Sequence, residues 1–377
     1  MRAVVLGGKL QGVEAVYLAH QAGWEVTLVD RNPQAPAVGL CDSYRRLDIL
    51  RDAEALTEVL RGADLIIPAL EDERALTFLA ELAAAQEYPL AFDPAAYDVS
   101  SSKRKSDLLF RQNGIPAPSY WPGCGFPLIA KPSALSGSRG VRLIADQREL
   151  DEFFKETCPG GGDYILQEFL EGDSYSLEVI GLKGRFLPLL VTELEMDDDF
   201  DCKRVSAPVK LDPALVRQFA KMAEKVAGLL DLTGVMDLEV ILHQGVLKLL
   251  EIDARLPSQT PTAVYKATGV NIVELLYRVF SLGELPREVD LSVKSGVVYE
   301  HIRVSPEGVE TLGEHIISDA GPLRLVRDFY GADEALTNFE PGRVEWVATL
   351  IVTGADRDKA WERRCEVLAA IGKRFSR

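Results

Sequence analysis

The chain has 377 residues, of which 47% are hydrophobic and 27% charged, a composition typical of a globular protein with two or three domains. Its formal charge of −16 disfavours nucleic acid as a partner, because a polyanion would be repelled. No apolar run approaches the ~20 residues of a membrane span, and five scattered cysteines without a CxxC pair indicate reduced thiols in a cytoplasmic protein.

Residues 1–97 alternate apolar strands with helical segments, which predicts a parallel sheet with ligand-binding groups at the carboxyl ends of its strands. A glycine-rich segment, Gly7–Gly12, follows the first strand. A polar run at Ser100 breaks the pattern and marks a domain boundary. The strands are expected over residues 2–6, 25–29 and 64–68, with a helix over about 13–22.

Short strands are expected in residues 126–185, and they lie around a small, glycine- and serine-rich segment. This segment, Ser133–Gly140, has the composition of a loop that closes over a ligand. A strongly amphipathic helix is expected over residues 212–230. The predicted short strands cover residues 127–131, 141–145, 164–169 and 175–181.

The most informative stretch runs from Val235 to Arg255 and predicts a hairpin with its turn at His243–Gly245. Asp237 and Glu239 are two residues apart and therefore share one face of the first strand. A turn of odd length would bring this face beside the acidic face of the second strand. Three charged residues share that second face for the same reason, namely Glu251, Asp253 and Arg255.

Carboxylates packed this closely repel one another unless a cation compensates, and Mg²⁺ prefers oxygen ligands. We therefore predict that Asp237, Glu239, Glu251 and Asp253 hold magnesium. The alternative is the solvated face of an edge hairpin. The metal site is favoured because the charges cluster at the strand ends and a polar, proline-bounded loop, residues 256–261, follows them.

Nucleotide binding must use a device other than the P-loop, because the pattern GxxxxGK[ST] is absent. Lys131 ends an apolar strand just before the predicted closing loop, whose backbone N–H groups could lie on phosphates. Lys103 begins a helix that runs toward a Gly-Ile-Pro turn, and it is a second candidate. Either lysine alone would more often be a surface residue, so they count in combination.

The first glycine-rich loop allows two interpretations. A dinucleotide site needs GxGxxG, but Lys9 stands where the second glycine must admit the pyrophosphate. Asp30 could still mimic the ribose-binding acid of an NAD-dependent dehydrogenase. In a ligase, Lys9, Leu10 and Gln11 would line a pocket, with Asp30 and Glu71 placed to attract amino groups. Capping of a helix or turn explains the two acids about equally well.

In this order, these residues resemble the ATP-grasp superfamily over essentially the whole chain. The resemblance implies an α/β fold, α+β in part, with a Rossmann-like domain (1–97), a linker helix and lid subdomain (98–185) and a C-terminal ATP-grasp domain (186–377). It places Gln167–Leu170 against adenine and Asp173 against the ribose. The usual closing motif is Glu-x-Asn-x-Arg, and here Asp253 replaces the asparagine.

Within the superfamily the chain resembles the ligases that join 3-methylornithine to L-lysine in pyrrolysine biosynthesis. The resemblance implies an isopeptide between the carboxylate of (3R)-3-methyl-D-ornithine and the ε-amine of L-lysine. The segments that carry it are Gly7–Gly12, Ser176–Val179, Met236–Glu239 and Glu251–Pro261.

The resemblance also implies roles for individual residues. Two or more Mg²⁺ ions would bridge the ATP phosphates, Glu251 and Lys131 would act at the phosphoryl group, and Arg255 would stabilise an oxyanion. The residues expected to bind the nucleotide are Lys9, Lys103, Lys131, Ser138, Gln167, Glu168, Phe169, Leu170 and Asp173. Those expected to contact the amino acids are Leu10, Gln11, Asp30, Glu71, Glu178, Arg204, Asp253, Arg255 and Ser258.

Other activities stay open at this point. A D-alanine–D-alanine-type or carboxylase-type activity is the nearest alternative, and a non-catalytic amino-acid-binding protein is a third. The acidic run Asp197–Asp201 could cradle a cationic substrate, although such runs are usually solvated loops. A homodimer is possible.

Overall fold

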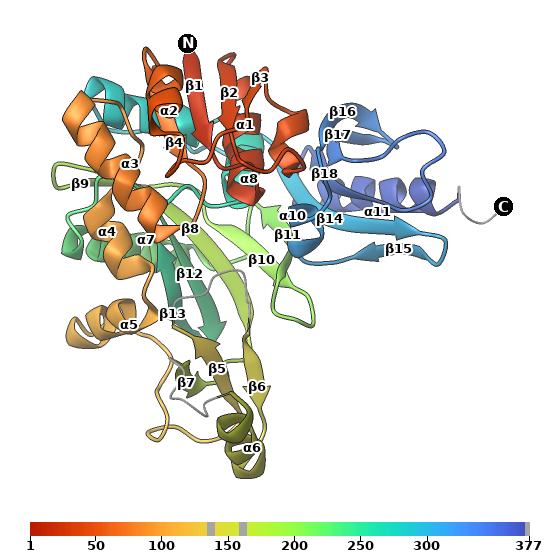
Figure 1. Ribbon diagram of the computed structural model, residues 1–377. Helices are drawn as coiled ribbons and strands as arrows, with labels where there is room; N and C mark the ends of the chain where they lie inside the picture. The colour runs from red at the N-terminus through yellow and green to blue at the C-terminus, as the bar shows by residue number, and fades with distance from the viewer. Residues whose placement is uncertain (134–139, 158–163, 374–377) are drawn as a thin grey trace.

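The computed structural model describes residues 1–133, 140–157 and 164–373, and its strands form three sheets (Figure 1). In the view of Figure 1 the N-terminal sheet lies at the top, a small sheet lies at the bottom, and a large sheet runs between them and out to one side. Most of the predicted closing loop, including Ser138, lies outside the described residues.

The N-terminal sheet is parallel throughout, in the order β3-β2-β1-β4, which confirms the predicted α/β arrangement. The short strand β3 was not predicted from the sequence. The strands are β1 (Arg2–Leu6), β2 (Glu25–Val29), β3 (Ser43–Arg45) and β4 (Leu65–Pro68). The helices are α1 (Leu10–Gln21), η1 (Pro36–Gly39), α2 (Ala53–Leu60), α3 (Glu73–Gln86) and α4 (Pro94–Ser100).

The glycines after β1 are required by close packing. Gly7 has φ +105°, and a Cβ there would lie 2.3 Å from the carbonyl oxygen of Ala69. A Cβ on Gly12 would lie 2.2 Å from the carbonyl oxygen of Gly7. Only glycine allows the turn to fold this tightly against the ends of β1 and β4.

The small sheet is antiparallel in the order β6-β5-β7 and is covered by α6, with Leu128, Ile144 and Phe153 buried between them. The fourth predicted strand of this region, β8 (Asp173–Leu182), instead pairs with β10 and β12 in the large sheet. The change of sheet therefore lies before Asp173, earlier than the predicted boundary at residue 185. The elements of this part are α5 (Lys103–Gln112), β5 (Leu128–Pro132), β6 (Arg142–Ile144), α6 (Gln147–Thr157) and β7 (Tyr164–Glu168).

The large sheet follows the order β13-β12-β8-β10-β11-β14-β18-β17-β16, with β9 and β15 paired beside β8 and β14. Its further strands are β9 (Arg185–Pro188), β10 (Thr192–Met196), β11 (Cys202–Ala207), β12 (Gly234–His243), β13 (Val246–Asp253), β14 (Gly296–Ser305), β15 (Gly308–Thr311), β16 (Arg324–Phe329), β17 (Ala332–Thr337) and β18 (Trp346–Gly354). Its helices are α7 (Pro213–Leu229), α8 (Thr260–Thr268), α9 (Ile272–Tyr277), η2 (Arg278–Leu282), α10 (His315–Ser318) and α11 (Arg357–Gly372).

The N-terminal domain is joined to the large sheet through α1 and α8. The Thr262 N–H donates to the buried Glu14 carboxylate at 2.6 Å, and the Asn271 amide donates to the Leu18 carbonyl at 2.8 Å. One hydrophobic cluster contains residues of both parts, such as Leu28 and Val297. This packing fixes the groups that face each other across the junction. None of the described helices is long and apolar enough to cross a membrane.

Candidate active site

A cavity of about 560 Å³ lies between the small sheet, the β12–β13 hairpin and the N-terminal domain. The predicted metal-binding carboxylates, both lysines and Arg255 line it together. They arrive from separate parts of the chain, because Lys103 begins α5, Lys131 lies in β5 and Gln11 lies in α1. The prediction that these residues share one site is therefore met by the fold.

The acidic residues of the hairpin share one face, but the strand register that brings them together arises differently from the prediction. The turn has two residues, Gln244 and Gly245, both with positive φ, rather than an odd number. A two-residue turn alone would pair Asp237 with Ile252 and turn the second acidic face away. A β-bulge after Glu239 absorbs one extra residue, so that Asp237 pairs with Asp253 and Glu239 with Glu251.

Two of the hairpin carboxylates carry a strongly raised pKa. Burial, followed by the charge of Glu251, raises the pKa of Glu239 to about 8. Burial and the neighbouring Glu239 raise the pKa of Asp237 well above its usual range, although Ser176 donates a short hydrogen bond to it. Buried carboxylates that raise the pKa of one another gain from a bound hard cation, so the chemistry of these oxygen donors fits Mg²⁺.

Glu251 differs because cations flank it. The Lys103 ammonium lies 3.2 Å from its carboxylate. Burial alone would raise the pKa of Glu251, but the charges of Lys103 and Lys131 outweigh burial and lower it. Burial lowers the pKa of Lys131, and the charge of Glu251 offsets part of that effect. The two lysines thus give this side of the cavity a positive charge that could bind polyanionic phosphates.

Arg255 joins the hairpin to the N-terminal domain. Its guanidinium donates to both oxygens of Asp253, at 3.0 and 2.6 Å, and also to the Leu70 carbonyl and the Glu71 carboxylate, each at 3.2 Å. The Tyr97 ring lies 5.4 Å from the guanidinium carbon. Arg255 is almost fully buried, so its orientation is fixed before any substrate binds.

The end of β7 and the residues directly after it form another wall of the cavity. Gln167, Glu168, Phe169 and Leu170 all line it, and their contact with adenine stays a prediction. The Glu168 carboxylate accepts from the Ser119 N–H at 2.8 Å and lies 3.5 Å from the Lys248 ammonium, and these partners outweigh burial and lower its pKa. Asp173, predicted to hold the ribose, is exposed and does not line the cavity. Its role stays a prediction.

A second cavity, of about 830 Å³, lies at the carboxyl edge of the N-terminal sheet. Lys9, Leu10 and Asp30 line this cavity and not the first one, so Lys9 is separated from Lys103 and Lys131. The Asp30 carboxylate accepts from the Gly8 and Asn32 N–H groups, each at 2.7 Å. The capping interpretation of Asp30 is thereby confirmed, whereas its contact with substrate stays a prediction.

The two cavities meet at a short boundary. Of the residues that line each, Gln11, Glu71, Ser258 and Glu314 line both. The Gln11 amide donates to the Glu71 carboxylate at 3.4 Å, and the Ser258 hydroxyl donates to the Glu314 carboxylate at 2.7 Å. We call these four residues the junction.

Arg204 does not line the cavity, so its predicted role in orienting substrate stays a prediction. Val205 faces the cavity, so Arg204, its neighbour in β11, points to the opposite side of the sheet. There its guanidinium pairs with the buried Glu300 and with Glu195, 4.9 Å from the Trp361 ring centre. Arg204 therefore fastens α11 to the sheet.

Glu178 lies on the correct face of the sheet but below the cavity surface. It is fully buried and pairs opposite Asp237 across β8 and β12. Burial raises the pKa of Glu178 to about 7. Because it does not line the cavity, direct contact with substrate stays a prediction.

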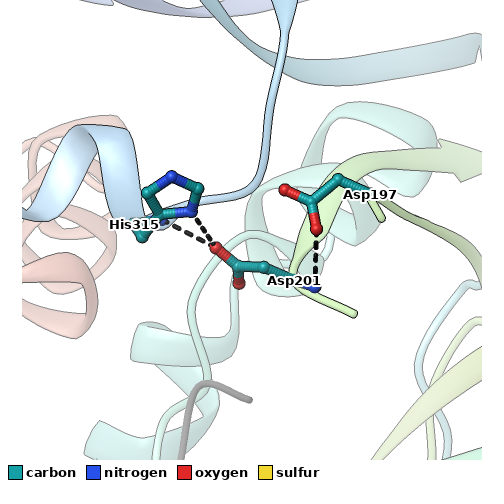
Figure 2. Close-up of side chains that lie close together, drawn as sticks. All are labelled: Asp197, Asp201 and His315. Carbon is teal, nitrogen blue, oxygen red and sulfur yellow. Dashed lines mark hydrogen bonds and ion pairs between the residues drawn. The ribbon is translucent and has the colours of Figure 1, made fainter. Parts of the chain in front are cut away.

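The acidic run after β10 is not simply a solvated loop (Figure 2). Asp197 and Asp201 line the cavity, and the Asp201 carboxylate accepts from the His315 ring at 2.6 Å and from its N–H at 3.0 Å. Asp197 accepts from the N–H groups of Asp201 and Gly313. Within the described ranges, these are the only three acidic or histidine side chains whose ligand atoms converge within 4.8 Å. Their hydrogen bonds clamp the loop to the segment before α10.

Sequence reasoning missed Glu314 and Gln259. Gln259 has φ +70° and is 4% exposed, and its amide donates to Glu314 at 2.8 Å. Gln259 lies inside the segment that carries the family resemblance, so the motif could have suggested it. Glu314 lies in the short segment between β15 and α10, which has no recognisable pattern, and only the packing of distant segments brings it to the site.

Comparison with known proteins matches residues 100–259 to the ATP-grasp domain and residues 3–88 to the PylC-like N-terminal domain. The chain is 36% identical to the 3-methyl-D-ornithine–L-lysine ligase of Methanosarcina mazei, over 98% of this chain and 95% of that protein. It is 33% identical to the ligase of the same name from Methanosarcina barkeri, over 98% of each chain.

Solved structures show the same fold at low identity. The biotin carboxylase domain of Hydrogenobacter thermophilus 2-oxoglutarate carboxylase, in complex with MgADP, ADP and bicarbonate, has a TM-score of 0.74 at 18% identity, covering 97% of this chain and 89% of that one. N5-carboxyaminoimidazole ribonucleotide synthetase from Thermotoga maritima has a TM-score of 0.67 at 21% identity, covering 97% and 98%. These likenesses confirm the predicted ATP-grasp architecture.

Proposed function

The chain belongs to the 3-methyl-D-ornithine–L-lysine ligase family of ATP-grasp enzymes, and we propose that it catalyses the reaction for which its relatives are named. It joins the carboxylate of (3R)-3-methyl-D-ornithine to the ε-amine of L-lysine, with ATP converted to ADP and phosphate. The product is 3-methylornithyl-N6-lysine, a precursor of pyrrolysine. Family membership favours this ligase over the dehydrogenase and the binding protein.

One observation carries the mechanism: four carboxylates, two lysines and an arginine converge on a single cavity. Such a set suits phosphoryl transfer, in which catalysis is mainly positioning and electrostatic stabilisation. Asp237, Glu239, Glu251 and Asp253 would hold two Mg²⁺ ions. When bound, the ions neutralise the charge of the transferring phosphoryl group.

The side chains of the protein then divide the remaining tasks. Lys103 and Lys131 grip the ATP phosphates beside Glu251, and Gln167–Leu170 contact the adenine. The substrate carboxylate attacks the γ-phosphorus of ATP, the bond from that phosphorus to the bridging oxygen breaks, ADP leaves, and an acyl-phosphate forms. Arg255 is fixed by Asp253 and Glu71, so its charge is already placed for the oxyanion that forms when the amine attacks.

The experiment that tests this proposal measures ADP release with Mg-ATP, L-lysine and 3-methyl-D-ornithine, together with the mass of the product. We expect turnover that requires both amino acids and a product with the mass of their condensation. Turnover with other pairs alone, such as two D-alanines, would retain the ATP-grasp ligase and contradict these substrates.

A matched pair of variants ties turnover to the hairpin. Asp237→Asn removes one buried carboxylate from the cavity and should abolish ADP release. Asp231→Asn makes the same chemical change at an exposed residue with φ +49°, a conformation that asparagine tolerates, and should leave turnover unchanged. Equal activity in the two variants would contradict the assignment of the metal site.

A further inference from the structure

Glu314 is the one junction residue that sequence reasoning did not assign. It lies on the segment between β15 and α10 and lines both cavities. The first cavity holds the groups that form the acyl-phosphate, and the second is formed by the N-terminal domain. An amine that enters from the second cavity to attack the acyl-phosphate must therefore pass this carboxylate.

The Glu314 side chain is held by one of its two oxygens. The Ser258 hydroxyl donates to Oε2 at 2.7 Å, and the Gln259 amide donates to the same oxygen at 2.8 Å. Within residues 1–133, 140–157 and 164–373, no hydrogen bond to Oε1 is formed. The carboxylate is thus fixed in orientation while its second oxygen keeps the capacity to accept a proton.

Several carboxyl, thiol and phenol groups of the described residues interact electrostatically with Glu314. They are Asp201, Glu71, Glu239, Cys202 and Tyr299, which arrive from four different parts of the fold. Burial, and then the charges of Asp201 and Glu71, raise the pKa of Glu314 to about 7. Ordinary carboxylates titrate near 4, so this one is matched to proton transfer at neutral pH.

Glu71, the other acid of the junction, is placed differently. Its carboxylate lies 3.2 Å from the Arg255 guanidinium and accepts from the Gln11 amide. Among the described residues, Glu314 forms no ion pair with lysine or arginine. The two acids therefore suit different tasks, with Glu71 binding an ammonium group and Glu314 accepting a proton.

We propose that Glu314 is the general base that deprotonates the attacking amine at the junction, an inference that rests on the ligase function proposed above. The ε-ammonium of lysine gives its first proton to Oε1 of Glu314, and the neutral amine attacks the carbonyl carbon of the acyl-phosphate. The C–N bond forms, the bond from the carbonyl carbon to the phosphate oxygen breaks, and the second proton leaves with inorganic phosphate. Glu314 returns its proton to solvent.

The variant Glu314→Gln tests the proposal, because it keeps an acceptor for Ser258 and Gln259 but cannot take up a proton. We expect ligation of lysine to fall roughly 10²- to 10⁴-fold, the usual contribution of general-base catalysis. Hydroxylamine is already uncharged at neutral pH and needs no base. Hydroxamate formation from 3-methyl-D-ornithine, Mg-ATP and hydroxylamine should therefore stay within a few-fold of the unmodified enzyme. Glu310→Gln, at an exposed residue of β15, is the matched control.

The outcomes separate the two proposals. Retained ligation of lysine, or equal loss of ligation and hydroxamate formation, would overturn the role of Glu314. An absence of hydroxamate with the unmodified enzyme would instead contradict the proposed acyl-phosphate chemistry itself. The pH profile gives a second readout: kcat/KM for lysine should fall in acid as Glu314 becomes protonated, and Glu314→Gln should lose that limb.

Discussion

His301 allows a quantitative prediction, because the fold holds it neutral. It lies in β14, is 1% exposed, and its Nδ1 is 2.8 Å from the Thr349 hydroxyl. Burial, with a smaller contribution from His315, lowers the pKa of His301 from 6.5 to about 3. The unfolded chain therefore binds a proton below pH 6.5 that the folded chain does not, and stability is lost as the pH falls from 6.5 toward 3.

The size of this effect follows from the two pKa values. A solution at pH 5 is about 1.5 pH units below the pKa of the histidine in the unfolded chain, and each unit corresponds to about 1.4 kcal/mol. His301 alone should therefore lower the free energy of unfolding by about 2 kcal/mol between pH 7 and pH 5. The substitution His301→Asn keeps a group for Thr349 but cannot be protonated.

The assay compares melting temperatures of the unmodified protein and His301→Asn at pH 7 and pH 5. The unmodified protein should lose a few degrees more than the variant on acidification, while any packing loss in the variant appears at both pH values and cancels. His243→Asn, at the end of β12, is the control: its hydrogen bond to the Glu171 carbonyl is lost at both pH values, so its loss on acidification should match that of the unmodified protein. Equal acid-induced losses with His301→Asn would refute the reasoning.

Three further changes probe the site and its scaffold. Arg255→Lys should lower kcat by roughly 10²- to 10³-fold with an unchanged KM for ATP, because the lysine lacks the guanidinium N–H groups that are placed to donate to the oxyanion. Steady-state ADP release measures both constants. Lys131→Met should raise the KM for ATP by roughly 10- to 100-fold, as expected when a charged hydrogen bond is removed. Gly39→Ala places a Cβ 2.1 Å from the Leu323 carbonyl oxygen and should lower the free energy of unfolding by roughly 1–3 kcal/mol. Chemical denaturation measures this change. Gly125→Ala is the control, because no atom lies within 4 Å of the added Cβ.

Local periodicity was sufficient to predict the acids of the hairpin. Asp237 and Glu239 are two residues apart in one strand, and a period of two places them on one face whatever the rest of the chain does. The register with Glu251 was not predictable in the same way. It depends on a two-residue turn combined with a bulge, and a bulge is a property of the paired strands rather than of either sequence alone.

The direction in which Arg204 points and the sheet to which β8 belongs were not predictable from the sequence, for a related reason. Alternation shows that Arg204 and Val205 face opposite sides, but not which side holds the cavity. That choice is made by α11, whose Trp361 and Arg364 cover the Arg204 side. Strand β8 likewise follows the strands of the small sheet in the sequence, and only its pairing with β10 and β12 assigns it to the large sheet.

Asp253 stands where the Glu-x-Asn-x-Arg motif has asparagine, and this change is consistent with the position of Arg255 between the hairpin and the N-terminal domain. A carboxylate can accept two hydrogen bonds from one guanidinium, as Asp253 does from Arg255, whereas an asparagine amide offers one acceptor and one donor. The pair turns Arg255 so that its remaining donors reach Leu70 and Glu71 in the N-terminal domain. The same aspartate that makes the hairpin more anionic therefore also fixes the junction through which we propose that the amine arrives.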